Sequence, residues 1–145
     1  MYRITRSISF CYGHRLLGHA GKCRHLHGHN ARAVVTLEDA TLDEQGMLVD
    51  FYELGNAIKG WIDDELDHTM ILCRQDPLVP LLQKAGERIL VVDWNPTAEL
   101  LARMIFERVA AAGYPVRDVT LWETETCSAS HRADPSRPAE ERDSG

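Results

Sequence analysis

The hydrophobic periodicity of this chain changes twice, and this order of periods is the feature that most constrains its fold. Residues 2–11 alternate between apolar and polar side chains, and residues 26–38 include a β-branched run, Ala-Val-Val-Thr-Leu. Both patterns are typical of strands. Residues 51–66 instead carry apolar side chains at helical spacing, which predicts a helix with one buried face. A second helical pattern follows, and residues 116–123 and 126–132 then read as a closing pair of strands.

The ends of the two helices can be predicted from residues that favour such ends. Asp50 is suited to cap the first helix, which we expect to end near Leu66. For the second helix we favour Asn95 as the cap, with Pro96 at the first helical position, and keep Thr97 as the alternative cap. Two weaker signals predict a short helical turn at residues 77–83 and a short strand at residues 88–93.

These elements together predict an α+β fold with the order ββααββ. We expect an antiparallel four-stranded sheet with two main helices on one face. The whole of residues 1–132 would form a single domain, since no linker interrupts it. Residues 133–145 hold Pro, Ser and charged residues without a large apolar side chain, so we expect a disordered tail.

Composition and charge exclude several classes of function. The net charge of −6 argues against a nucleic-acid binder, whose affinity would come from Lys and Arg contacts to phosphates. No apolar run is long enough to span a membrane, and the N-terminus lacks the apolar region of a secretory signal. We therefore expect a cytoplasmic protein with free thiols, among which Cys11, Cys73 and Cys127 are interpreted as structural.

The segment from Lys22 to His29 carries the strongest signal for chemistry. Histidines at alternate positions of a strand point to one face, where their imidazoles can share a metal. Three histidines with an open fourth position are typical of a catalytic zinc site, although an isolated His-x-His is more often a polar strand surface. Spacing alone leaves five candidate ligands open. They are His14, His19, His25, His27 and His29, of which His14 would reach the site from a loop.

Three further features carry weaker signals. Cys23 follows Lys22 and lies near the possible metal, so it is a candidate general base or nucleophile, although a lone cysteine is usually a buried apolar residue. Asp67-His68 follows a helix end and has the order in which an Asp fixes the tautomer of a His, a pair that also occurs by chance. Glu123 lies near a strand end, where it is either solvated or available to a guanidine-like ring edge.

At this point the chain resembles the 6-pyruvoyltetrahydropterin synthase / 6-carboxytetrahydropterin synthase family. The resemblance spans about residues 2–131, and its six motifs occur in the family's order, which makes the set specific although each motif alone is only suggestive. The motifs are His-Arg-Leu from His14, Cys-x-x-x-His-Gly-His from Cys23 to His29, Gly-Met-Leu-Val-Asp-Phe from Gly46, Leu-Asp-His from Leu66, Asn-Pro-Thr-Ala-Glu from Asn95 and Trp-Glu-Thr from Trp122.

The resemblance implies a tunnelling fold (T-fold), in which the sheets of several subunits close into a barrel, with trimers that pair into hexamers and active sites between subunits. It implies a Zn²⁺ cofactor on His14, His27 and His29, while His19 and His25 match no ligand position. The proton-transfer group would be Cys23, Asp67 and His68, with Cys23 as base. Glu123 would anchor a pterin ring, helped by Thr97 or nearby backbone.

The implied reaction is a lyase step in queuosine biosynthesis. The substrate would be 7,8-dihydroneopterin triphosphate, and the products 6-carboxy-5,6,7,8-tetrahydropterin, acetaldehyde and triphosphate. One alternative is a 6-pyruvoyltetrahydropterin synthase that eliminates triphosphate; another, of a different class, is a non-catalytic, zinc-containing pterin-binding protein. The chain departs from the family at Cys11-Tyr12-Gly13, where small residues are common, and at His131, where an aromatic residue is common.

Overall fold

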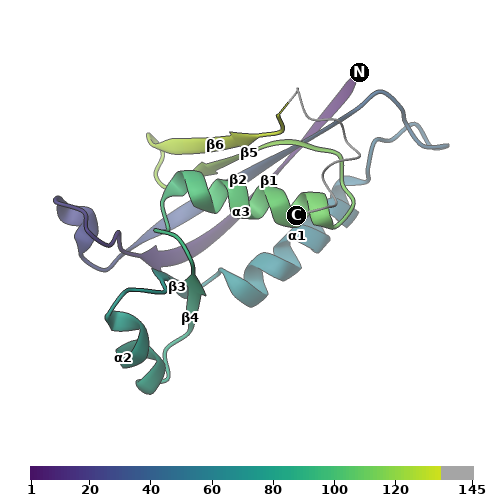
Figure 1. The fold of residues 1–145 in the computed structure, drawn as a ribbon. Coiled ribbons are helices and arrows are strands. Elements are labelled where there is room, and N and C mark those ends of the chain that lie inside the picture. The colour runs from purple at the N-terminus through teal and green to yellow at the C-terminus, as the bar shows by residue number, and fades with distance from the viewer. Residues whose placement is uncertain (135–145) are drawn as a thin grey trace.

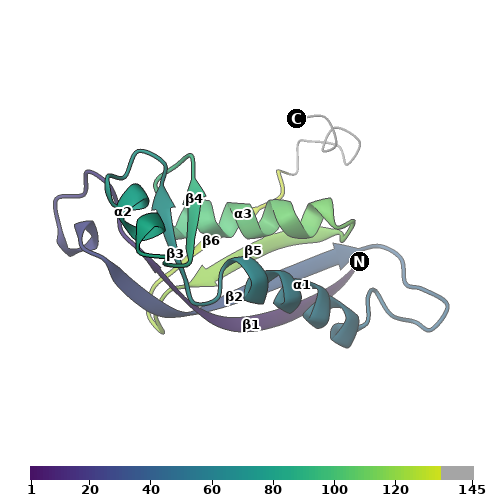
Figure 2. The same ribbon diagram turned by 90° about the horizontal axis from the view of Figure 1, so that it is seen from below.

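A computed structural model of the chain describes residues 1–134. In this part of the chain, six strands form one sheet in the order β4-β3-β1-β2-β5-β6 (Figures 1 and 2). The strands are β1 (Tyr2–His14), β2 (His27–Asp39), β3 (Thr69–Cys73), β4 (Ile89–Val92), β5 (Val116–Trp122) and β6 (Ser128–Arg132). The helices are η1 (Lys22–Arg24), α1 (Phe51–Glu65), α2 (Leu78–Lys84) and α3 (Ala98–Ala111).

The centre of the sheet is a long antiparallel hairpin of β1 and β2. The two strands pair along their full length, from Tyr2 opposite Asp39 to His14 opposite His27. The predicted end of the first strand at residue 11 was too early, and His14 lies on the strand instead of in a loop. Gly13 hid this continuation in the sequence, because a glycine gives no signal of alternation even though Tyr12 and His14 keep the buried parity.

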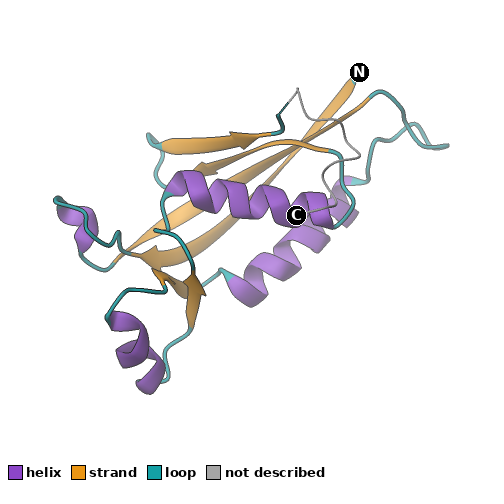
Figure 3. Ribbon diagram, viewed as in Figure 1, coloured by secondary structure: helices purple, strands orange, loops and turns teal. Residues whose placement is uncertain are grey.

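One face of the sheet carries the hydrophobic core. Alternate residues of β1 and β2 point to this face, and α1 and α3 pack across it, as predicted (Figure 3). The apolar stripe of α1 and the inner residues of α3 meet the sheet there. The fully buried side chains include Val35, Leu37, Leu54, Ile62, Leu101, Ile105 and Leu121. The opposite face of the β1–β2 hairpin exposes Thr5, Ser7 and Ser9.

The predicted four-stranded antiparallel sheet was wrong. β3 and β4 extend the sheet beyond β1, and both pair in parallel, β3 with β1 and β4 with β3. The strand expected at residues 88–93 is thus confirmed as β4, but as a member of the same sheet. β3 gave no signal because its sequence, Thr-Met-Ile-Leu-Cys, is mostly apolar without alternation. Parallel strands that are buried on both faces have nearly continuous apolar sequences, and periodicity cannot distinguish such a run from a buried helix segment.

The structure confirms one predicted helix cap and corrects the other. The Asp50 carboxylate accepts hydrogen bonds from the backbone N–H groups of Tyr52 and Glu53, at the start of α1. At α3 the cap is Thr97, whose hydroxyl accepts from the N–H of Leu100, so the preferred assignment to Asn95 was wrong. Asn95 instead exchanges two hydrogen bonds with the backbone of Leu17, each 2.8 Å long. Asn95 thus makes a tertiary contact with Leu17 and does not form the helix cap that its local sequence favoured.

The C-terminal region is described as far as Asp134. Ala133, which we expected in the tail, donates a backbone hydrogen bond to Arg117 and packs against the core. The rest of the predicted disordered tail lies outside the described residues. None of the described helices has the length and apolar character needed to cross a membrane.

Candidate active site

Three of the five candidate histidines meet at the end of the β1–β2 hairpin. His14 and His27 are opposite each other in the strand register, and His29 lies opposite Tyr12. Since paired residues share a face of the sheet, all three imidazoles point to the side that carries the core. The Nε2 atoms of His14 and His29 are 3.2 Å apart, and one ring nitrogen from each of the three histidines lies within 4.8 Å of the others.

The backbone fixes which nitrogen of two of these histidines faces the cluster. Nδ1 of His14 donates to the carbonyl of Pro96, and Nδ1 of His27 donates to the carbonyl of His25, each at 2.7 Å. Because a carbonyl can only accept, the hydrogen is on Nδ1, and Nε2 is left with a lone pair for a metal. Burial lowers the pKa of His14, which favours the neutral imidazole that metal binding requires.

The spacing of the ring nitrogens also suits a metal. Nitrogen ligands on a tetrahedral metal, with bonds of about 2.0–2.1 Å, lie about 3.3 Å apart. The 3.2 Å between Nε2 of His14 and Nε2 of His29 is close to that value. The three histidines therefore form a candidate metal centre, which β1 and β2 carry and in which two backbone carbonyls orient the rings of His14 and His27.

Glu123 lies beside the three histidines, just after the end of β5. Its carboxylate oxygens are 3.7 Å from Nε2 of His14 and 3.8 Å from Nε2 of His29. The Tyr12 hydroxyl donates to Oε1 of Glu123 at 2.6 Å. Tyr12 is only 3% exposed, and both burial and the Glu123 carboxylate raise its pKa, so the hydroxyl keeps its hydrogen and always donates. Glu123 is thereby held in one orientation.

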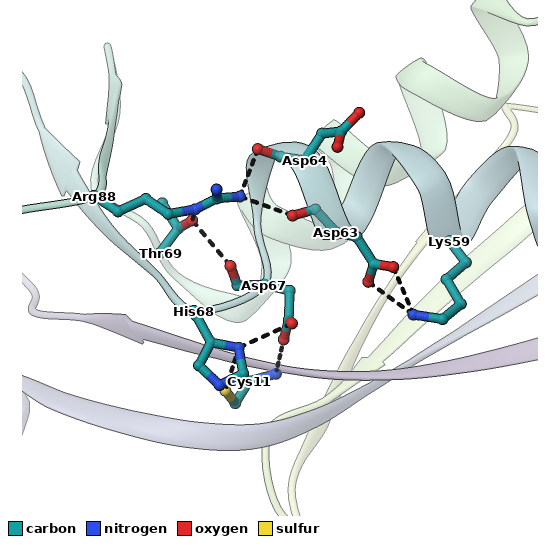
Figure 4. Close-up of polar contacts among 8 residues, drawn as sticks. All are labelled: Cys11, Lys59, Asp63, Asp64, Asp67, His68, Thr69 and Arg88. Atoms are coloured by element: carbon teal, nitrogen blue, oxygen red, sulfur yellow. Dashed lines mark hydrogen bonds and ion pairs between the residues drawn. The ribbon is translucent and has the colours of Figure 1, made fainter.

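Asp67 and His68 form a second polar cluster at the turn between α1 and β3, and their partner is Cys11 (Figure 4). Nδ1 of His68 is 2.9 Å from Oδ2 of Asp67 and 3.5 Å from Sγ of Cys11. The other carboxylate oxygen of Asp67 accepts the backbone N–H of Cys11 at 2.9 Å. This hydrogen bond, together with the His68 ring, lowers the pKa of Asp67, which keeps the carboxylate ionised.

The turn that carries this pair is held by backbone and side-chain contacts. His68 has a φ of 54°, a left-handed conformation that is unfavourable for a residue with a side chain. Its N–H donates to the carbonyl of Cys11 at 2.7 Å. From β4's side of the turn, Arg88 donates to the Thr69 hydroxyl and to the carbonyl groups of Asp63 and Asp64 (Figure 4). Cys11 thus holds the strained residue itself, and Arg88 holds the residues before and after it in the turn.

Within the described residues, Cys23 belongs to neither cluster. It lies in η1, in the loop that joins β1 to β2, and its carbonyl accepts the N–H of Leu16. Both views of the fold show η1 projecting from the end of the hairpin, away from the turn between α1 and β3 (Figures 1 and 2). A single chain therefore brings the predicted metal ligands together with Glu123, and Asp67 with His68, but it does not bring Cys23 to His68.

One open cavity lies at the end of the β1–β2 hairpin and extends to the turn between α1 and β3. It has a volume of about 520 Å³, and its lining includes His27, His29, Cys11 and His68. Gly13 and Gly28, which face each other in the register, also line it. A Cβ atom on Gly28 would lie 3.1 Å from the carbonyl oxygen of Tyr12, so the glycine between the two histidines permits the close approach of the strands. The cavity is large enough for a bicyclic ring.

The loop between β1 and β2 is anchored by residues that sequence reasoning missed. Arg15 donates from Nε to the carboxylate of Asp76 at 2.6 Å, and Asp76 is only 2% exposed. Together with the Asn95–Leu17 hydrogen bonds, this pair ties the loop after His14 to the segments before α2 and α3. Arg15 stands out in the sequence only as part of the His-Arg-Leu motif, and nothing there singles out Asp76, since the contact joins positions far apart.

Two interpretations of the cysteines need correction. Cys73 is buried, as expected for a structural thiol, but Cys127 is exposed. Cys11 is partly buried and faces His68, so it is not merely a packing residue. Its parity on β1, opposite to that of Phe10 and Tyr12, was the available signal that it points away from the core. Tyr12 was noticed in the sequence only as a departure from a family pattern, and its bond to Glu123 emerges from the structure.

Comparisons with known proteins agree with this geometry. The sequence model of the family described as 6-pyruvoyl tetrahydropterin synthase matches residues 3–134. A Rickettsia bellii protein named 6-carboxy-5,6,7,8-tetrahydropterin synthase is 35% identical over 134 residues, covering 88% of this chain and 97% of that protein. A protein of the same name from Aquifex aeolicus is 40% identical over 124 residues, covering 77% of this chain and 76% of that protein.

Solved structures show the same fold. An uncharacterized protein from Wolinella succinogenes superposes with a TM-score of 0.76 at 28% identity, covering 92% of this chain and 98% of that one. The 6-pyruvoyl tetrahydropterin synthase of Caenorhabditis elegans superposes with a TM-score of 0.68 at 23% identity, covering 92% of this chain and 96% of that one. On the match of the family over nearly the whole described chain, this protein belongs to the 6-pyruvoyl tetrahydropterin synthase family.

Proposed function

We propose that this protein is a zinc-dependent lyase that converts 7,8-dihydroneopterin triphosphate to 6-carboxy-5,6,7,8-tetrahydropterin, acetaldehyde and triphosphate, on the route to queuosine. The observation that carries the proposal is the convergence of His14, His27 and His29 beside Glu123. Relatives at 35% and 40% identity carry the name 6-carboxy-5,6,7,8-tetrahydropterin synthase, which favours this reaction over others in the family.

The three histidines would hold Zn²⁺ and leave one coordination position open. Three neutral imidazoles with such spacing are a donor set that zinc accepts. The carbonyls of Pro96 and His25, which accept from the rings of His14 and His27, keep these two rings oriented. When bound, zinc would supply the Lewis acidity that makes the hydroxyl groups of the substrate side chain more acidic. Residues of the chain would carry out proton transfer and bind the pterin ring.

Proton transfer would rest on Cys23, Asp67 and His68. Asp67 accepts from Nδ1 of His68 and so fixes the tautomer, which leaves Nε2 free to exchange a proton with the substrate. The side chain of His68 is 78% exposed, as a group that meets a ligand or a neighbouring subunit must be. Cys23 would be the base. Because one chain keeps Cys23 apart from His68, we propose that the complete group forms from two subunits.

Glu123 would anchor the pterin ring. A carboxylate can accept two hydrogen bonds from the adjacent N–H groups of a guanidine-like ring edge. Tyr12 orients this carboxylate through Oε1. Thr97 caps α3, and the carbonyl of its neighbour Pro96 accepts from the metal-side histidine His14. We propose that Thr97 contributes to the pterin site through this placement.

The assembly we propose is the T-fold barrel of trimers that pair into hexamers, acting in the cytoplasm. The sheet supports it, because within residues 1–134 the helices pack on one face of the β1–β2 hairpin, and the other face exposes polar side chains that could line a barrel. Residues 1–132 would be the single domain of each subunit. The edge strands β4 and β6 each have one unpaired side within the described residues, where a neighbouring sheet could continue the ladder.

The test is to incubate the zinc-loaded protein with 7,8-dihydroneopterin triphosphate and to identify the products by mass spectrometry. Release of 6-carboxy-5,6,7,8-tetrahydropterin with acetaldehyde is the expected result. Formation of 6-pyruvoyltetrahydropterin would instead identify a 6-pyruvoyltetrahydropterin synthase. Pterin binding without turnover by the zinc-loaded protein would contradict a lyase and support a non-catalytic pterin-binding protein.

A further inference from the structure

Cys11 contacts both members of the Asp67–His68 pair, and the reaction proposed above gives it no role. We propose that Cys11 is a positioning residue for this pair: its sulfur shares the Nδ1 hydrogen of His68 with Asp67 and so holds the ring in one orientation, with Nε2 free for the substrate. The role rests on the function proposed above, in which His68 exchanges a proton through Nε2. Cys11 acts through His68 and not on the substrate.

The register of the sheet places Cys11 beside His68. β1 and β3 pair in parallel, and their first pair joins Tyr12 to Thr69. One residue earlier in both strands, the backbone N–H of His68 donates to the carbonyl of Cys11 at 2.7 Å. Successive residues of a strand point to opposite faces, so the Cys11 side chain lies on the face opposite to the buried Tyr12. Cys11 and His68 both line the open cavity. The thiol is therefore placed by the pairing of β1 with β3.

The hydrogens of this cluster follow from what each group can accept. The Asp67 carboxylate is ionised, because the backbone N–H of Cys11 lowers its pKa, and the His68 ring and the Cys11 thiol lower it further. An ionised carboxylate only accepts, so the hydrogen of the neutral His68 ring is on Nδ1, which lies 2.9 Å from Oδ2 of Asp67. Sγ of Cys11, 3.5 Å from the same Nδ1, is then a second and weaker acceptor. One hydrogen thus links the ring to two groups.

Asp67 alone leaves the His68 ring free to move. The side chain of His68 is 78% exposed, and within the described residues the polar contacts of its ring are those with Asp67 and Cys11. A ring held by one hydrogen bond can swing about its side-chain bonds while it keeps that bond, and a second acceptor narrows this motion. The N–H of Cys11 also orients Asp67, since it donates to Oδ1 at 2.9 Å. The N–H, the carbonyl and the sulfur of one residue therefore position both members of the pair.

The tautomer of His68 can be measured without substrate, by long-range ¹H–¹⁵N NMR of the full, zinc-loaded chain labelled with ¹⁵N-histidine. The spectrum would be recorded at about pH 8, above the ordinary pKa of histidine, and His68→Ala would assign the signals. The unmodified chain should show the Nδ1–H form, and Cys11→Ala a mixture with the Nε2–H form. Cys11→Ser supplies another weak acceptor and should restore much of the Nδ1–H form. Ser9→Ala is the matched control, because Ser9 is exposed two residues earlier on the same face of β1.

Steady-state turnover is the second measurement. Cys11→Ala should lower kcat by about tenfold with little change in KM, because the substrate contacts remain and only a proton-transfer group is misplaced. This loss is smaller than the roughly 10²–10⁴-fold loss expected when the acid–base group itself is removed. Cys11→Ser should recover most of the lost kcat. Cys11→Val fills the space of the sulfur without an acceptor, so it should match Cys11→Ala and replaces that variant if it does not fold.

Two results would overturn the role of Cys11. One is an Nδ1–H tautomer or a kcat that is unchanged in both Cys11→Ala and Cys11→Val. The other is a rise in KM without a fall in kcat, which would make Cys11 a substrate contact. If the unmodified chain does not turn over the pterin, the proposed function fails, whereas the NMR comparison still decides whether Cys11 positions His68.

Discussion

His14 and His29 approach each other through ring nitrogens, and the nitrogen of His14 at this contact lacks a hydrogen. The contact is therefore either a hydrogen bond donated by Nε2–H of His29 or a pair of lone pairs that can share one cation. The second state is the one that the proposed zinc centre requires.

His27→Ala should abolish high-affinity zinc binding, because it leaves two histidines where the proposed centre needs three. Elemental analysis of the dialysed protein would measure the bound zinc. His19→Ala is the matched control, since His19 lies in the loop that precedes β2 and its ring accepts the N–H of Gly21, apart from the three histidines. A full complement of zinc in His27→Ala would contradict the ligand assignment.

Tyr12→Phe should weaken pterin binding without loss of zinc. The phenol donates to Glu123 at 2.6 Å, and its removal frees the carboxylate to rotate. A hydrogen bond to a charged group contributes roughly 1.5 kcal/mol, which corresponds to about a tenfold rise in Kd or KM. Fluorescence titration with a pterin product would measure the effect. An unchanged affinity would mean that Tyr12 is only part of the core.

At the scale of the element, Arg15 and Asp76 decide how firmly the loop between β1 and β2 is held. Asp76→Asn leaves the Arg15 charge without its partner, and breaking a buried pair costs about 3 kcal/mol. Urea unfolding would measure the loss at neutral pH. Asp93→Asn is the matched control, because the pair of Asp93 with Arg74 is exposed and should have no measurable effect on stability.

The same pair predicts a dependence on pH. Hydrogen bonding to Arg15 lowers the pKa of Asp76, so the folded state binds this proton less readily than the unfolded chain. Its contribution is complete above about pH 5 and is lost as the pH falls through the lowered pKa. The difference in stability between the unmodified chain and Asp76→Asn should therefore shrink towards pH 3. A constant difference across this range would contradict the assignment.

Elements with strong local signals could be predicted from the sequence. The stripe of α1, the cap at Asp50 and the strands before and after the helices were predicted, although the first strand was given too early an end. β3 and its parallel pairing could not be predicted, because a short apolar run has no period of its own. The cap of α3 was misassigned for another reason: Asn95 is taken by Leu17, a contact across the fold that local preference does not contain.

The candidate site, too, could be predicted from the sequence only in part. Alternate positions of a strand placed His27 and His29 on one face, but the choice of His14 over His19 and His25 came from a family resemblance. Only the register, with His14 opposite His27, gives that choice a physical reason. The contact of Cys11 with His68 joins two positions 57 residues apart and had no signal in sequence.

At the scale of the whole molecule, the separation of Cys23 from His68 leads to a test of assembly. Cys23→Ala and His68→Ala should each reduce turnover by about 10²–10⁴-fold, as expected when an acid–base group is removed. If each site takes Cys23 from one subunit and His68 from the next, unfolding and co-refolding the two variants in equal amounts should restore about a quarter of the activity.

The control for this experiment is each variant refolded alone, which should remain inactive. Size-exclusion chromatography with light scattering would verify that the mixed and the single preparations reach the same mass. Failure of the mixture to regain activity, with assembly intact, would place the whole proton-transfer group within one chain. The zinc content of both variants should stay constant at the histidine centre, because neither residue is among its ligands.

The pairing of His14 with His27 ends the same ladder that begins with Tyr2 and Asp39. Inserting or deleting one residue in either strand would turn every later side chain to the other face, so core residues and imidazoles would be misplaced together. A chain that has lost the alignment for chemistry has thus also lost its solubility and stability. Errors of this kind would be removed by cellular quality control, and a stable but mis-aligned form of the enzyme should not accumulate.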